Sequence, residues 1–162
     1  MTDATFEDGA ELSLFVKAMD ADSVPIVSAL AQDAVFPITE MKWDRAARRF
    51  AILLNRFRWE DRDTAEKRGR PYERVQTLLV IEDAHNVSSQ GVDRSDSDMV
   101  LSLLSLTFEP GEDGTGRVIL TLAGDGAIGV DVECLDISLK DVTRPYIAPS
   151  GKAPDHGDDS SD

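Results

Sequence analysis

Strict alternation of apolar and polar residues is the clearest pattern in the chain, and it lies toward the carboxyl end. Apolar side chains recur at every second position over residues 118–122 and again over residues 128–134. Between the two runs stands a Gly-Asp-Gly sequence, residues 124–126, which is typical of a tight turn. Because successive side chains of a strand point to opposite faces, the pattern predicts a β-hairpin. Cys134 falls on the apolar parity, so we expect it to be buried and chemically inert.

Earlier in the chain, one segment follows a helical period. Four apolar residues are spaced as on one face of a helix that ends near residue 32: Val24, Val27, Leu30 and Ala31. Pro25 lies in the first turn, where the amide hydrogen that it lacks would have no partner within the helix. The pattern therefore predicts a short helix that follows a first strand at residues 12–17.

Other apolar runs predict the remaining strands. We expect these strands at residues 34–43, 50–59, 75–81 with a bent continuation over 85–92, and 99–108. The densely charged residues 60–69 are interpreted as a surface loop or a short helix. Residues 93–98 predict a turn, and residues 135–142 predict either a strand extension or a short helix.

The strand that begins at Phe50 changes parity partway along its length. Phe50, Ile52 and Leu54 share one face, whereas Phe57 has the opposite parity. In a strand, a shift of one residue moves every later side chain to the other face of the sheet. We interpret the change as a β-bulge near Asn55.

Together these elements predict an α+β fold that is mainly antiparallel β. About seven strands would form a curved sheet or a small pleckstrin-like barrel with one or two short helices, since strongly curved sheets of this size often close. Residues 1–10 are predicted to be a flexible amino terminus and residues 11–142 a single globular domain. Residues 143–162, rich in Pro, Gly, Ser and Asp, predict a disordered acidic tail.

Four motifs occur in order along the chain: FAILLNRFRWE at residues 50–60, YERV at 72–75, LTFEPG at 106–111 and GDGAIGVDVE at 124–133. With these motifs the chain resembles a family of alphaproteobacterial proteins that is known only as a domain of unknown function. The resemblance extends from about residue 12 to residue 142. It implies an origin in a bacterial cytoplasm, and it brings with it no catalytic residue, ligand or cofactor.

Composition narrows the compartment and the class of partner. The chain has 31 acidic and 17 basic residues and a net charge of −14, which disfavours generic attraction to nucleic acids or anionic membranes. Cys134 is the single cysteine, so no disulfide can form within the chain, and a reducing compartment is favoured. No apolar run is long enough to span a membrane, and the acidic first residues differ from a signal peptide. We therefore expect a soluble, cytoplasmic protein.

Motifs for the common catalytic and metal sites are missing. His85 and His156 stand far apart in the sequence, so no set of metal ligands converges around them. The DRSDSD run at residues 93–98 lacks the central glycine and the closing glutamate of a calcium loop. The chain contains neither a nucleophile elbow nor a phosphate-binding loop. We expect no metal and no cofactor, and a binding role is favoured over catalysis.

The distribution of charge provides one candidate site. Residues 42–74 contain eleven basic and six acidic residues, a net charge of +5, whereas the rest of the chain carries −19. Arginine binds carboxylates and phosphates in bidentate fashion, and tryptophan can stack on a base. The candidate binding residues are Arg45, Arg48, Arg49, Arg56, Arg58, Trp59 and Arg70. Alternatively, these arginines pair with nearby Asp and Glu side chains while the tryptophans belong to the core.

Three functional hypotheses follow. The first is a non-catalytic binding or adaptor domain whose arginine and aromatic surface contacts an acidic protein or another anionic ligand. The second, which the net charge makes less favourable, is binding of single-stranded nucleic acid through the same surface. The third is an enzyme whose site matches no familiar motif.

Overall fold

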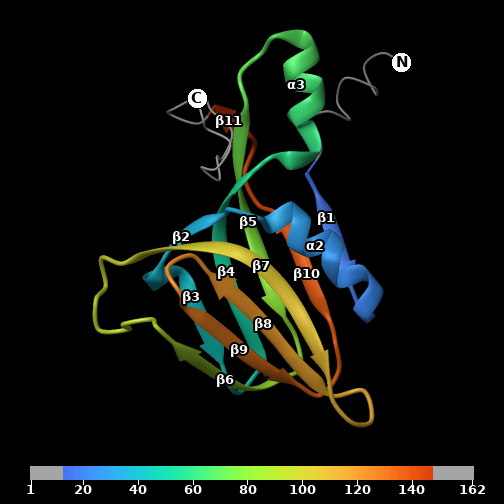
Figure 1. The fold of residues 1–162 in the computed structure, drawn as a ribbon, viewed down its shortest axis with the longest axis vertical. Coiled ribbons are helices and arrows are strands. Elements are labelled where there is room, and N and C mark those ends of the chain that lie inside the picture. Colours follow the sequence, from blue (N-terminus) through green and yellow to red (C-terminus); the bar gives the residue numbers. More distant parts are fainter. Residues whose placement is uncertain (1–12, 148–162) are drawn as a thin grey trace.

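Within residues 13–147, which the computed structural model describes, eleven strands form one antiparallel sheet that curls around an apolar interior (Figure 1). The strands are β1 (Phe15–Ala18), β2 (Val35–Pro37), β3 (Met41–Asp44), β4 (Arg49–Phe57), β5 (Glu73–Ile81), β6 (Ala84–Gln90), β7 (Val100–Pro110), β8 (Gly116–Leu122), β9 (Ala127–Val132), β10 (Ile137–Asp141) and β11 (Tyr146–Ile147). Their order is β1-β10-β5-β4-β2-β7-β8-β9-β6, with β3 added to β4 and β11 added to β5.

Two α-helices and three single 3-10 turns complete the described chain. They are η1 (Ala21–Ser23), α2 (Val24–Ala31), η2 (Ile38–Glu40), η3 (Trp59–Asp61) and α3 (Arg62–Arg68). α2 lies across the sheet, whereas α3 projects from the end where β4 and β5 extend beyond it (Figure 1). Among the described residues no helix is long and apolar enough to cross a membrane.

Two pairs of strands turn one corner together and fold the sheet onto itself. β5 leads into β6, and β9 leads into β10, with short bends between them. At the bends Glu82 N donates to Asp136 O at 2.9 Å, and Glu133 N donates to Asp83 O at 3.0 Å. Asp83 adopts a φ of +55°, a left-handed conformation that aspartate tolerates better than most residues. As a result β4, β5 and β10 face β7, β8 and β9 across a single apolar core.

The helix α2 seals the core on the side of β7. Of its four apolar residues predicted to share one face, Val24, Val27 and Ala31 are buried in the core cluster, and Leu30 is partly buried against it. The Ser28 hydroxyl accepts a hydrogen bond from Leu106 N at 2.9 Å. This bond lies beside the bulge of β7 between Leu103 and Ser105, so the helix holds the strand where its ladder with β8 is interrupted.

The predicted mainly antiparallel sheet, the short helices and the carboxyl-terminal hairpin are confirmed, but the strand number and the closure are not. The sheet has eleven strands in place of about seven and does not close into a barrel. One reason is that Pro37 ends β2 and leads into η2, which divides the strand expected over residues 34–43. The corner likewise separates β5 from β6 and β9 from β10, although the apolar pattern of the sequence continues almost without a break through each pair.

The prediction that Cys134 is buried is wrong. The alternating parity of β9 stops at Val132, because the chain bends at the corner immediately afterwards. Cys134 is exposed there, and its thiol donates to Asp83 Oδ2 at 3.0 Å. This hydrogen bond raises the pKa of the thiol, so the protonated form is favoured.

Ordered structure continues past the predicted boundary at residue 142. Tyr146 and Ile147 form β11 on the edge of β5, inside the segment 143–162 that was expected to be disordered. Thr143 Oγ1 also accepts a hydrogen bond from Gln76 N at 3.0 Å. The rest of that segment and the predicted flexible residues 1–10 lie outside the described residues.

Gly116 provides a test of the packing between β7 and β8. A Cβ atom at Gly116 would lie 2.5 Å from the ring of Phe108, whereas one at Gly129 would approach no atom closer than 3.4 Å. We expect Gly116→Ala to lower the free energy of unfolding by about 1–3 kcal/mol, because the partly buried ring of Phe108 and the carbonyl of Glu109, 2.6 Å from the added Cβ, must move. The matched variant Gly129→Ala should change it by less than about 1 kcal/mol. Urea denaturation measures both, and equal losses would contradict the packing.

Candidate functional site

The strand in which a bulge was predicted carries an arginine on its buried face. β4 pairs with β5 without a register shift from its second residue to its last, so the predicted bulge at Asn55 is wrong. Arg56 faces the interior of the protein, as Leu54 does two residues before it, and its side chain is 0% exposed. Phe57 is buried as well, where β4 leaves the sheet toward η3. The apparent change of parity therefore reflects a buried charge and not an irregular strand.

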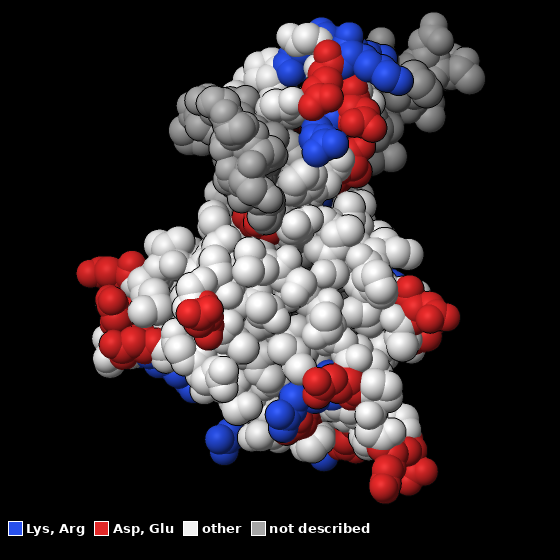
Figure 2. Space-filling view, in the orientation of Figure 1, with Lys and Arg blue, Asp and Glu red and all other residues white. Residues whose placement is uncertain are grey.

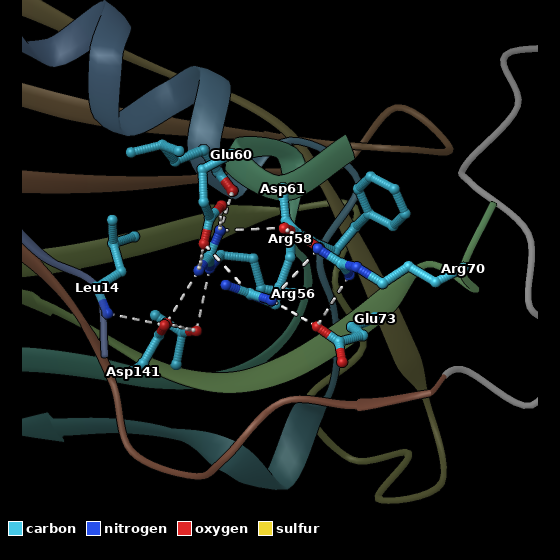
Figure 3. Close-up of polar contacts among 11 residues, drawn as sticks. Leu14, Arg56, Arg58, Glu60, Asp61, Arg70, Glu73 and Asp141 are labelled. Carbon is cyan, nitrogen blue, oxygen red and sulfur yellow. Dashed lines mark hydrogen bonds and ion pairs between the residues drawn. The ribbon is translucent and has the colours of Figure 1, made fainter. Parts of the chain in front are cut away.

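All three guanidinium nitrogens of Arg56 donate hydrogen bonds (Figure 3). Nη1 and Nη2 bind the two carboxylate oxygens of Glu60 at 2.8 and 3.0 Å. Nη2 also donates to Asp141 Oδ1 at 3.0 Å, and Nε donates to Thr77 Oγ1 at 3.1 Å. Two backbone carbonyls accept from Nη1 at 3.3 and 3.4 Å. Such complete pairing is what a buried charge requires.

Asp141 connects this arginine to three strands. It is 5% exposed, and it accepts hydrogen bonds from Thr77 Oγ1 at 2.8 Å and from the backbone N–H of Leu14 at 2.9 Å. Burial opposes the charge on Arg56, but the hydrogen bonds and charges of Glu60 and Asp141 outweigh it and raise the pKa of the guanidinium. The ion cluster therefore stays charged and ties β10 to β1, β4 and β5.

A second ion cluster holds the projecting segment of α3 to the sheet (Figure 3). Arg70 donates two hydrogen bonds to the carboxylate of Asp61, both 2.7 Å long. Arg58, which is 6% exposed, lies 3.5 Å from Asp61 and also donates to Glu73. The hydrogen bond from Arg70 holds the pKa of Asp61 below its ordinary value, and the charge of Arg58 acts in the same direction.

Trp59 packs beside this cluster and is only half-buried. Its indole N–H donates to the carbonyl of Gln32 at 2.9 Å, and its ring lies 4.7 Å from that of Phe57 in an edge-on arrangement. The guanidinium carbon of Arg62 lies over the Trp59 ring, 5.7 Å from its centroid. These contacts give Trp59 a packing role at the base of α3.

The remaining predicted arginines lie at the opposite end of β4. Arg48 pairs with Glu133, and Arg49 Nε lies 3.1 Å from both carboxylate oxygens of Glu82. Arg45 is exposed and makes no ion pair with any residue that the structure describes. Arg49 and Arg56 are seven residue steps apart along an extended strand, a distance of roughly 23 Å.

The seven candidates therefore do not form one surface. Arg56, Arg58, Trp59 and Arg70 gather at the base of α3, and Arg45, Arg48 and Arg49 lie at the far end of β4. Figure 2 shows Lys and Arg intermixed with Asp and Glu around α3, and a broad uncharged surface over the middle of the sheet. Pairing with carboxylates, the alternative interpretation, describes every arginine of the set except Arg45. Contact between an acidic protein and the exposed arginines stays a prediction.

A pocket that the sequence did not indicate lies where the sheet remains open. β6 stands at the end of the strand order, and β3 pairs with β4 alone, so one edge of each strand lacks a neighbour among the strands of residues 13–147. We call the gap between these two edges the seam. One end of the seam is joined by a backbone hydrogen bond of 2.9 Å from Ala84 N to Arg48 O. The pocket, about 170 Å³ in volume, lies within the seam.

The pocket is apolar inside and polar at its rim. Six apolar side chains line it: Ile38, Met41, Trp43, Phe50, Val87 and Ile128. The polar lining residues are Thr39, Ser89, Ser97 and Arg94. None of these four side chains, nor the Trp43 indole, makes a hydrogen bond or ion pair to another described residue. The lining thus combines an apolar interior with donors and a cation that are available to a ligand.

Acidic residues flank Arg94 without pairing with it. Asp93 accepts hydrogen bonds from Ser95 N and Oγ at 3.0 and 2.6 Å, and Asp96 accepts from Asp98 N at 3.1 Å. These local bonds shape the loop between β6 and β7. Over residues 13–147, no group of three His, Cys, Asp or Glu side chains is arranged to hold a metal ion.

The sequence contains a weak signal for this pocket. Met41 and Trp43 alternate with charged residues, and Arg94 is the only basic residue in an acidic run. Both features can be read from the sequence, but whether these residues come together in space depends on how far the sheet curls. That curvature is set by the corner at Asp83, which no local pattern reveals.

The buried pairing of Arg56 can be tested by removing its charge. We expect Arg56→Met to lower the free energy of unfolding by about 3–5 kcal/mol, because Asp141 is left buried without its counter-ion. The control is Arg49→Met, which breaks a half-exposed pair and should lose less than about 1 kcal/mol. Urea denaturation at neutral pH measures both, and similar losses would contradict a structural role for Arg56.

Asp61 predicts a specific loss of stability in acid. Its pKa is lowered from 3.8 in the folded protein, so the unfolded chain takes up the proton first as the pH falls. The stabilisation is complete above about pH 5 and declines as the pH falls through 3.8 toward the lower folded value. Asp61→Asn should flatten the decline of unfolding free energy over this range. Asp131→Asn, whose partner Arg117 is half-exposed, should flatten it less.

Comparison with known proteins gives a family and no function. Searches of curated proteins and of solved structures each return no match. A family model does match residues 14–156, which include the whole sheet, both ion clusters and the pocket. The chain therefore belongs to the family described as protein of unknown function (DUF2948).

Proposed function

We propose that this protein is a non-catalytic binding domain that takes a small apolar monoanion into the seam pocket. The observation that carries the proposal is the position of Arg94, an arginine without an ion pair in the described chain, at the rim of a half-open apolar pocket. Apolar pockets with a few convergent polar groups are the usual form of small-molecule sites. This proposal keeps the anionic ligand expected from the sequence and moves it to other residues.

The size of the pocket limits the apolar part of the ligand. A cavity of about 150 Å³ lined by aliphatic and aromatic side chains accommodates a benzene ring. The seam pocket has a similar volume and a similar lining, with Trp43 and Phe50 available for aromatic contacts. A single ring or a branched aliphatic chain of comparable size therefore fits, and a large cofactor does not.

The charge of the surroundings limits the polar part. Arg94 attracts an anion, but Asp93, Asp96 and Asp98 stand in the same loop, and the chain carries −14. A dianion such as phosphate would gain from one arginine and be repelled by several carboxylates. A carboxylate bears one charge and matches the guanidinium in bidentate geometry. We infer that the ligand is a monocarboxylate.

Benzoate is the direct probe. In nuclear magnetic resonance titrations it should shift the indole N–H signal of Trp43 and amide signals of β6, whereas the uncharged analogue benzamide should bind at least tenfold more weakly. Arg94→Gln should weaken benzoate binding about tenfold, which equals about 1.4 kcal/mol. The matched control is Arg45→Gln, which removes an exposed arginine that does not line the pocket and should leave the binding of benzoate unchanged.

A second variant tests the contribution of the apolar pocket to benzoate binding separately from that of the Arg94 charge. Val87→Phe places a larger side chain at the pocket wall and should abolish benzoate binding while Arg94 is retained. Inorganic phosphate should produce no shift in the same residues. If benzoate shifts no pocket resonance, or if the Arg45 and Arg94 variants weaken its binding equally, the proposed function is wrong.

A further inference from the structure

The seam also presents unpaired backbone on both sides of the pocket. In the described part of the chain, β6 has a ladder only with β9, and β3 has a ladder only with β4. Within residues 13–147, the backbone of residues 85–90 and 42–44 makes no backbone hydrogen bond outside these ladders, whereas Met41 N donates to Ile38 O at the end of η2. Free strand edges are templates for another strand, and proteins normally shield them. Here side chains of both strands line an apolar pocket.

We propose that the monoanion is the carboxyl terminus of a peptide, which adds a short strand to the seam. This inference rests on the proposed function, since it places the terminal carboxylate at Arg94. The last side chain, an apolar one such as leucine, would fill the pocket between Trp43, Phe50 and Ile128. Main-chain hydrogen bonds to a free edge would supply affinity, and the pocket would supply specificity.

The position of Arg94 fixes the direction of the peptide. Arg94 follows the carboxyl end of β6 by four residues, so residues upstream of the carboxylate would run back along β6 toward Ala84. Because β3 runs toward the Arg48 end of the seam and β6 runs away from it, the peptide would be antiparallel to β3. β3 has four residues, which limits the paired segment to three or four peptide residues.

Charge further defines the peptide. The loop that carries Arg94 also carries three aspartates, and the chain has a net charge of −14. Residues upstream of the carboxylate would therefore be neutral or basic, because acidic ones would be repelled. The expected partner is a protein whose chain ends in a β-prone, neutral or basic segment with an apolar last residue.

The probe is the peptide acetyl-Lys-Thr-Lys-Val-Thr-Leu with a free carboxylate, labelled on a lysine and followed by fluorescence anisotropy. It should bind, and benzoate should compete with it. Amidation of the carboxyl terminus should weaken binding at least tenfold, as should Arg94→Gln. N-methylation of alternate backbone amides should weaken binding at least tenfold in one of the two possible frames and little in the other, because only one set of amides faces a given edge.

The outcomes separate the two proposals. If benzoate binds at the pocket and the peptide does not, the peptide inference is wrong and the proposed function stands. If neither binds, both are wrong. If the peptide binds but N-methylation is tolerated in both frames, strand addition is wrong, and only recognition of the terminal residue remains. Arg45→Gln is again the matched control and should leave the affinity for the peptide unchanged.

Discussion

The fold depends on one buried ion cluster, that of Arg56 with Glu60 and Asp141. Its members come from β4, η3 and β10, and through Leu14 and Thr77 the cluster also reaches β1 and β5. A charge removed from water is stable only when every donor and acceptor around it is paired, so the cluster fixes the relative position of all these elements together. Its specificity is geometric: an apolar side chain at the same position would fill space without selecting a register.

The sequence pattern predicted those elements whose structure depends on interactions between residues close together in the chain. The helix at Val24–Ala31 and the hairpin of β8 and β9 were predictable, because period and turn residues specify them without reference to the rest of the chain. Arg56 was predicted to lie on a binding surface, and its burial was missed because it depends on Asp141, which lies 85 residues away. Cys134 was misplaced for a related reason, since the corner that exposes it depends on pairing between two distant bends.

The candidate site shows the same division. Sequence reasoning selected the residues with the strongest chemistry, the arginines at residues 45–70, and most of them pair with carboxylates of their own chain. The pocket instead combines ordinary apolar residues from five elements with four polar residues at its rim, and it exists because the sheet stops short of closure. A gap of this kind has no signature in composition or spacing.

The span of the Arg56 cluster also has a consequence for how the chain folds. During synthesis β4 appears long before Asp141, so the arginine on its apolar face at first lacks the buried carboxylate among its acceptors. The amino-terminal half can then collapse but cannot complete its interior, and the transition to the native sheet must await the last strands. Folding is thereby delayed until almost the whole described chain is present, and truncation before β10 would leave a collapsed, exposed intermediate.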